Sequence, residues 1–199
     1  PMAILIAFDI ETTGLSPYEH ALIEIAGVKF HPHEPAAETF QELAQPGAAI
    51  PAAVRDVTGI TDEMVAACRP PIEVVRSFLA WAGPDAYFLA HNASFDTRFI
   101  NATFLNGAEP APNLRVVDTL AWARERFPNA ASHALGPLLG AIGVATAGLH
   151  RALADAMGVR ALVTHLLADE PDPVRTVAAR VRQPALPRRQ SLLPDSMLD

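Results

Sequence analysis

Apolar runs along the chain predict the strands of a buried sheet. The run AILIAF (3–8) directly precedes Asp9 and is short and rich in residues that favour β-structure, so we expect a strand buried on both faces. Four more segments have the apolar or mixed character of strands, namely 21–30, 37–44, 86–91 and 115–119.

Helical periodicity and helix-end signals predict five helices among and after these strands. They are expected at 61–68, 70–83, 94–105, 132–143 and 153–169. Thr61 and Pro70 are typical residues for beginning a helix, and Gly83-Pro84 and Gly107 are typical for ending one. Three early strands followed by alternating helices and strands predict an α/β fold, with a mixed sheet flanked by helices.

Length and composition favour a single folded domain. A chain of 199 residues, half of them hydrophobic, can bury one sizeable core, which we assign to residues 1–170. From residue 171 onward the composition changes to five Pro and five Arg with little helical periodicity, so we expect 171–199 to be a flexible tail. A folded extension is the alternative.

The sequence predicts neither a membrane nor a secreted location. No apolar run reaches the roughly 18 residues that span a bilayer, and the segment PMAILIAFDIE lacks the basic residues and cleavage site of a secretory signal. The single Cys68 cannot form an internal disulfide, which suits a reducing compartment. We expect a soluble cytoplasmic protein.

The net charge argues at first against a nucleic-acid partner. It is −7, whereas proteins that follow a phosphate backbone usually carry a basic surface. Residues 171–199 hold five Arg and three Asp, which leaves ten basic and nineteen acidic groups, a net charge of −9, in residues 1–170. A nucleic acid would therefore need a local source of positive charge.

Four acidic residues continue apolar rows that should face the core. Alternate residues of a strand share a face, so Asp9 and Glu11 extend the apolar row of the first strand. Asp96 and Asp155 align with apolar residues one and two turns further along their helices. Each acid could instead be a helix cap or a surface residue, and a carboxylate in a first helical turn favours the dipole. Capping does not explain two acids at the end of a buried strand.

Inward-facing carboxylates predict a metal site. Ionised carboxylates are costly to bury without a cation or hydrogen bonds, and like charges brought together cost more. The ligands are hard oxygens, so Mg²⁺ or Mn²⁺ is the expected cofactor. Zinc is less suited because no Cys or His cluster accompanies these acids.

Three segments that carry the acids resemble the motifs of a known family. FDIETTGL (8–15), HNASFDTRF (91–99) and HRALADA (150–156) resemble, in order, the motifs of the DEDDh 3′→5′ exonuclease family, in particular the proofreading epsilon subunits of bacterial DNA polymerase III. The resemblance spans about residues 4 to 168 and leaves the tail uncovered. It implies a ribonuclease-H-like fold, which agrees with the pattern of elements.

Carried over residue by residue, the resemblance implies the roles of five side chains. The ligands of two divalent cations would be Asp9, Glu11, Asp96 and Asp155. His150 would be the general base; it precedes Asp155 by five residues, whereas the tyrosine branch of the family would have Tyr where this chain has Arg151. Two cations about 4 Å apart would act on the attacking water and the departing 3′ oxygen, and release 5′-mononucleotides.

The two cations would also allow a protein of negative net charge to bind a nucleic acid. They place positive charge where the terminal phosphates bind, so weak binding to a single-stranded DNA 3′ end needs no basic surface. We therefore expect removal of nucleotides from DNA 3′ ends, in proofreading or repair.

Softer matches to the family indicate residues that contact the nucleic acid. They are Thr12, Leu15, Val57, Thr58, His91, Asn92 and Phe95. Leu15 and Phe95 could equally be core residues. At Thr58 the sequence departs from the epsilon pattern, which commonly has His there.

Two other functions are compatible with these motifs. An exoribonuclease similar to RNase T or oligoribonuclease would use the same five residues, although DIETTGL and VTGIT favour DNA. A non-catalytic adaptor could keep the fold as a binding subunit, but all five chemical positions are occupied.

The tail suggests a protein partner. QSLLP (190–194), and less closely QPALP (183–187), resemble Gln-led apolar peptides that dock on bacterial sliding clamps; chance occurrence in a disordered tail is the alternative. A DNA polymerase catalytic subunit is a further expected partner.

Overall fold

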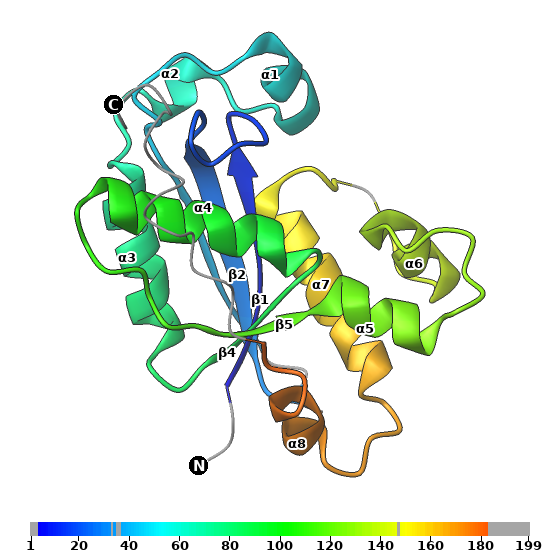
Figure 1. Ribbon diagram of the computed structural model, residues 1–199. Coiled ribbons are helices and arrows are strands. Elements are labelled where there is room, and N and C mark those ends of the chain that lie inside the picture. The colour runs from blue at the N-terminus through cyan, green and yellow to red at the C-terminus, as the bar shows by residue number, and fades with distance from the viewer. Residues whose placement is uncertain (1–3, 33, 35–36, 147, 183–199) are drawn as a thin grey trace, which may run out of the picture.

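A five-stranded sheet with helices on both faces forms the core of the fold (Figure 1). The computed structural model describes residues 4–182 apart from 33, 35–36 and 147. The strands are β1 (Leu5–Thr12), β2 (Leu22–Phe30), β3 (Ala37–Leu43), β4 (Tyr87–Ala90) and β5 (Arg115–Asp118). The helices are α1 (Ala52–Thr58), α2 (Asp62–Val65), α3 (Pro71–Ala82), α4 (Ala93–Asn106), α5 (Thr119–Arg126), α6 (Leu135–Ala141), α7 (Ala152–Leu166) and α8 (Pro173–Ala178). All five predicted strands are confirmed.

β1 lies at the centre of a sheet with the order β3-β2-β1-β4-β5. It is antiparallel to β2 along its whole length, but its parallel pairing with β4 ends where Ala7 meets Leu89. The register with β2 shifts between Glu11 and Thr12. The carboxyl end of β1 therefore extends past β4, at the edge of the sheet where α/β proteins commonly bind ligands.

Alternation along β1 divides the core into two halves. Ile6, Phe8 and Ile10 pack against α3 and α4, whereas Leu5 and Ala7 pack on the side that carries α5, α6 and α7. Figure 1 shows α4 crossing one face of the sheet and α7 running beside β1. The row that begins with Leu5 continues into the two acids of β1, which are thereby directed toward α7.

The helices differ from the predicted pattern in three places. α1 and α5 are not predicted, because α1 buries only Thr58 and α5 lacks a continuous apolar stripe. The helix expected at 61–68 is shortened to Asp62–Val65, and the chain then turns so that the Cys68 N–H donates to the Val65 carbonyl. In the described part of the chain, no helix is long and apolar enough to cross a membrane.

The segment after residue 170 is folded further than expected. α8 begins after Asp172, whose side chain accepts the Arg175 N–H, and buries Val177 against the α7 half of the core. The Arg182 N–H donates to the Val116 carbonyl on β5 at 2.8 Å. The expectation of a flexible tail is therefore wrong for residues 173–182, because local Pro and Arg content does not reveal a distant apolar contact. QPALP and QSLLP lie outside the described residues.

Candidate active site

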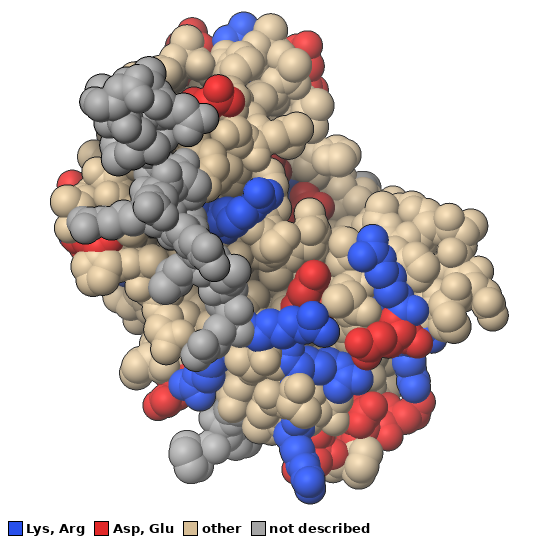
Figure 2. Space-filling view, in the orientation of Figure 1, with Lys and Arg blue, Asp and Glu red and all other residues tan. Residues whose placement is uncertain are grey.

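Acidic side chains from β1 and α7 meet at the carboxyl end of β1. Asp9 and Glu11 continue the row that faces α7, and Asp155 lies in the first turn of that helix. One carboxylate oxygen from each of these three residues lies within 4.8 Å of the others. Figure 2 shows a recess on this face with acidic atoms at its floor. The structure thus brings together three of the four predicted ligands.

Asp96 approaches the same place from the other side of β1. It lies in the first turn of α4 and is 2% exposed. Its carboxylate is hydrogen-bonded by the backbone of Ile10, at the edge of β1 that β4 leaves open. Asp96 is not one of the three acids that lie within 4.8 Å, but its charge is among those that raise the pKa of Asp9. It is a buried neighbour of the cluster.

Burial raises the pKa of all four carboxylates, and repulsion from neighbouring acids adds to it for Asp9, Glu11 and Asp96. Burial is the largest cause for each of them. The pKa of Asp9 is well above 3.8, and the charges of Asp96 and Asp155 add to the effect of burial. The pKa of Glu11 rises from 4.5 to about 7, and that of Asp96 rises from 3.8 to about 8. The cluster is therefore electrostatically strained until positive charge is added.

The donor set fits a hard divalent cation. Every ligand is a carboxylate oxygen, which is the ligand type that Mg²⁺ and Mn²⁺ prefer. Among the described residues, no other group of three potential metal ligands is found. The acids can bind a divalent metal, and their raised pKa values give that metal a strong electrostatic reason to bind.

His150 lies at the exposed rim of the cluster, directly before α7. Its backbone has φ 75°, which is uncommon for a residue other than glycine. This conformation lets the His150 N–H donate to Asp155 Oδ2 at 2.7 Å. The side chain is exposed, and its charge lowers the pKa of Asp155. The predicted base and the predicted ligand are therefore adjacent.

Glu24 on β2 is an acid of the site that the sequence analysis missed. It is 0% exposed, pairs in register with Glu11, and raises the pKa of both Glu11 and Asp9. Arg151, at the start of α7, lowers the pKa of Glu11 and forms an ion pair with Glu24. The signal that identified Asp9, an acid in an apolar strand row, also applies to Glu24.

Asp118 at the end of β5 holds the start of α4 and was likewise missed. Its Oδ1 accepts the N–H groups of Asn92 at 3.1 Å, Ala93 at 3.4 Å and Leu120 at 3.0 Å. One carboxylate therefore caps both α4 and α5, which satisfies N–H groups that have no partner within the helices. Because α4 begins here, Asp118 also fixes the helix turn that carries Asp96.

Three of the predicted nucleic-acid contacts lie at the surface and a fourth is partly buried. Leu15 is 81% exposed and Val57 is 59% exposed, so the alternative that Leu15 belongs to the core is wrong. Asn92 is exposed and turns the chain into α4 with φ 69°. Phe95 is partly buried and packs on Phe99, with ring centroids 5.0 Å apart. Phe95 thus belongs to both the core and the rim.

Other predicted contacts have side chains that are already hydrogen-bonded. Thr58 is 6% exposed and its hydroxyl donates to the Val54 carbonyl, and a nucleotide contact at this residue stays a prediction. Both ring nitrogens of His91 are also hydrogen-bonded, to the Thr119 hydroxyl and the His133 carbonyl, and its contact with the nucleic acid likewise stays a prediction. Burial lowers the pKa of His91.

Thr12 lies at the end of β1, beside the acids. It is 9% exposed, and its hydroxyl donates to the Gly14 carbonyl at 2.6 Å. The hydroxyl hydrogen of Thr12 is therefore used within the turn that leads to Leu15. The hydroxyl oxygen and the backbone of Thr12 remain next to the acidic cluster. Thr12 stays a predicted contact for a terminal 3′ hydroxyl.

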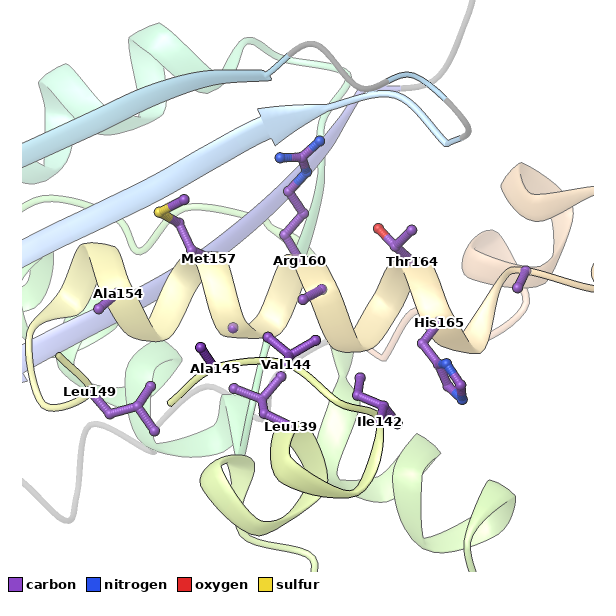
Figure 3. Close-up of a pocket in the computed structure, with 13 residues that line it drawn as sticks. Leu139, Ile142, Val144, Ala145, Leu149, Ala154, Met157, Arg160, Thr164 and His165 are labelled. Atoms are coloured by element: carbon purple, nitrogen blue, oxygen red, sulfur yellow. The ribbon is translucent and has the colours of Figure 1, made fainter. Parts of the chain in front are cut away.

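A separate groove of about 720 Å³ lies on the side of α7 turned away from the acids. Figure 3 shows Leu139, Ile142 and Val144 rising from α6 and the following loop toward α7. Most of the lining is apolar, and the ring of His165 stacks on Phe127. The groove lacks the convergent carboxylates of the recess, so we assign the chemistry to the acidic site.

Known exonucleases and DNA polymerases are similar to this chain over most of its length. The family model RNase_T, described as exonuclease, matches residues 6–162. The chain is 40% identical over 167 residues to a DNA polymerase III PolC-type from Streptococcus suis, and 40% identical over 163 residues to one from Listeria innocua. These alignments cover 84% and 81% of this chain but 11% of each relative. The chain thus spans only a small part of the length of these relatives.

Solved structures show the same fold. The zinc-bound complex of E. coli exonuclease I with single-stranded DNA matches with a TM-score of 0.75 and 18% identity, covering 88% of this chain and 43% of that one. Exonuclease X in complex with 5′-overhanging duplex DNA matches with a TM-score of 0.69 and 25% identity, covering 88% and 98% of the two chains. The predicted ribonuclease-H-like fold, a mixed sheet flanked by helices, is confirmed.

Proposed function

Because the chain belongs to the RNase_T exonuclease family, we propose that it removes 5′-mononucleotides from the 3′ ends of single-stranded DNA by two-metal-ion hydrolysis. The observation that carries this proposal is the meeting of Asp9, Glu11 and Asp155 within 4.8 Å, beside buried Asp96. The adjacent His150 supplies a base at the rim.

The carboxylates would hold the metal ions. Asp9, Glu11 and Asp155 are the nearest ligands, and Asp96 completes the set of acids on the opposite side of β1. We propose Mg²⁺ or Mn²⁺ because all donors are hard oxygens. When bound, such cations supply positive charge that stabilises the phosphate and the leaving oxygen in the transition state.

His150 would accept the proton of the attacking water. Histidine is the side chain that exchanges a proton near neutral pH, and this one is exposed to solvent beside the ligands. Its backbone bond to Asp155 fixes the position of the residue without using the ring nitrogens. The imidazole is therefore free to turn toward a bound water.

Exposed apolar side chains near the recess would receive the last bases of the strand. Leu15 and Val57 lie at the surface and offer contacts that do not depend on base identity. Asn92, Phe95 and Thr12 would contact the terminal nucleotide. Such binding is local, which suits a body with a net charge of −9 in residues 1–170.

Similarity to known proteins supports DNA as the substrate. The PolC-type relatives are DNA polymerases, and the exonuclease X structure contains DNA. On this basis we also propose association with a DNA polymerase catalytic subunit. The sliding-clamp contact through residues 183–199 stays a prediction.

A paired substrate experiment tests the proposal. Single-stranded DNA and RNA oligonucleotides of equal sequence, labelled at the 5′ end, are incubated with Mn²⁺ and with Mg²⁺. We expect DNA to shorten from its 3′ end faster than RNA, with release of 5′-mononucleotides, and Asp155→Asn to be inactive. Faster RNA digestion would support an exoribonuclease, and no digestion of either polymer would support a binding adaptor.

A further inference from the structure

A buried glutamate beside the acidic cluster is fully hydrogen-bonded by the protein. Glu24 is 0% exposed and pairs in register with Glu11. Its Oε1 accepts bonds from Gln41 Nε2 at 2.8 Å and Arg151 Nη2 at 2.7 Å. Its Oε2 accepts bonds from Arg151 Nε and from the Ala152 backbone N–H, both at 3.1 Å. Each oxygen has two donors, which leaves Glu24 little capacity to bind a metal ion.

Two residues at the start of α7 supply three of these four hydrogen bonds. Arg151 is the N-cap residue of α7 and makes no side-chain cap bond to its own helix, and Ala152 is the first helical residue. First-turn N–H groups have no acceptor within a helix, and a carboxylate at this end also favours the helix dipole. Glu24 therefore caps α7 from the neighbouring strand.

The start of α7 also holds two residues of the proposed chemistry. His150 directly precedes Arg151, and Asp155 follows it by one turn. The His150 N–H donates to Asp155 Oδ2 at 2.7 Å, and the Asp155 N–H donates to the Arg151 carbonyl at 3.1 Å. A shift of Arg151 relative to β2 would therefore move both His150 and Asp155 relative to Glu11.

We propose that Glu24 and Arg151 are positioning residues, which hold α7 against β2 so that Asp155 completes the metal cluster. This inference rests on the function proposed for that cluster. The two bonds from the Arg151 guanidinium fix direction as well as distance. The Arg151 charge also balances Glu24, which would otherwise add a fifth negative charge beside the ligands.

Two substitutions in the 199-residue chain test the positioning role. Glu24→Gln and Arg151→Met are each expected to weaken Mn²⁺ binding about 10- to 100-fold, as loss of a group that orients a metal ligand does. The free-Mn²⁺ signal in electron paramagnetic resonance measures this without substrate. On a single-stranded DNA oligonucleotide, kcat should fall by a similar factor while KM for DNA stays nearly unchanged. Arg151→Lys keeps the charge without the planar fork and should recover part of the loss.

A second background separates positioning from general damage. In Asp155→Asn protein, Glu24→Gln should change Mn²⁺ affinity by less than about twofold. The reason is that Glu24 acts on the metal through the position of Asp155, which this background has already replaced. An effect as large as in the wild-type background would overturn the proposal. Glu42→Gln is the matched control: Glu42 pairs with Ile25, on the opposite face of the sheet, and its ion pair is with Arg69. It should leave Mn²⁺ affinity and kcat unchanged.

Circular dichroism and thermal unfolding check that each variant folds. If Glu24→Gln does not fold, Gln41→Leu replaces it; this removes one bond to Glu24 and should weaken Mn²⁺ binding about two- to tenfold. Folded variants with wild-type Mn²⁺ affinity would overturn the positioning role alone. A wild-type chain that fails to bind Mn²⁺ would instead overturn the proposed function.

Discussion

Glu11 and Glu24 lie opposite each other on β1 and β2, yet they have contrasting surroundings. Glu24 is 0% exposed, and each of its oxygens accepts two hydrogen bonds. Glu11 is less buried, but repulsion from Asp155 and Glu24 adds to burial and raises its pKa to about 7. The more deeply buried acid is thus the better stabilised one.

The contrast separates an acid that supports the fold from an acid that binds a ligand. Burial alone does not identify the acid that binds a ligand, because both acids lie on the face of the sheet that packs against α7 and the more deeply buried one is already hydrogen-bonded. The supply of hydrogen-bond donors does: an acid whose lone pairs are filled by the protein has little to offer a cation, whereas an acid among acids needs one. Substitutions of the ligand acids and of Glu24 should therefore have different, and partly opposite, effects on stability and activity.

Asp9→Asn and Glu24→Gln should change stability in opposite directions. Loss of the Asp9 charge should lower kcat by at least about 10³-fold, because a metal ligand is lost. In the metal-free protein, Asp9→Asn should raise the melting temperature by about 2–4 °C for each kcal/mol of repulsion removed. Glu24→Gln should lower the melting temperature, because the Arg151 charge loses its partner. Melting curves in EDTA measure this, and metal-free Asp9→Asn melting below wild type would contradict the comparison.

His150→Ala should separate turnover from metal binding. The backbone N–H that binds Asp155 is retained, so Mn²⁺ affinity should change by less than about twofold. The imidazole is lost, and kcat should fall by about 10²-fold or more. His165→Ala, at the exposed far end of the same helix, is the control and should keep wild-type kcat. A normal kcat in His150→Ala would exclude this residue as the base.

The metal-free protein should lose stability as the pH rises. A carboxyl whose folded pKa is raised stabilises the fold while protonated, so this contribution is complete below its unfolded value. For Glu11 it is lost between pH 4.5 and about 7, and for Asp96 between pH 3.8 and about 8. At pH 8, Mn²⁺ at about 100 times its dissociation constant should raise the melting temperature by about 5–10 °C. At the same Mn²⁺ concentration, the rise in melting temperature should be smaller at pH 5. Equal rises at pH 5 and pH 8 would argue against a strained cluster.

Leu15→Ser should have the smallest of these effects. Loss of an apolar contact with the terminal bases should raise KM for single-stranded DNA about five- to tenfold and leave Mn²⁺ affinity unchanged. Met157→Ser is the matched control, since Met157 is 51% exposed but lies in the groove on the other side of α7. Equal KM changes in both variants would argue against a specific role for Leu15.

Local patterning was sufficient to predict the sheet. Successive strand residues point to opposite faces of the sheet, and the five predicted segments correspond to the five strands. Short helices were harder to predict because α5 lacks a continuous apolar stripe and α8 packs on a distant part of the core. α5 is capped by Asp118, which also accepts N–H groups at the start of α4, and the burial of Val177 in α8 depends on the α7 half of the core.

The sequence by itself determined which acids form a row, their order along the chain, and the His150 that precedes the last of them. Only the tertiary structure decided that Asp155 joins Asp9 and Glu11 within 4.8 Å, while Asp96 lies buried on the other side of β1. It also decided that Glu24 is satisfied, through donors on Arg151, 127 residues away. The physical reason is that periodicity specifies which face a side chain occupies, whereas its charge environment depends on partners that only folding brings together.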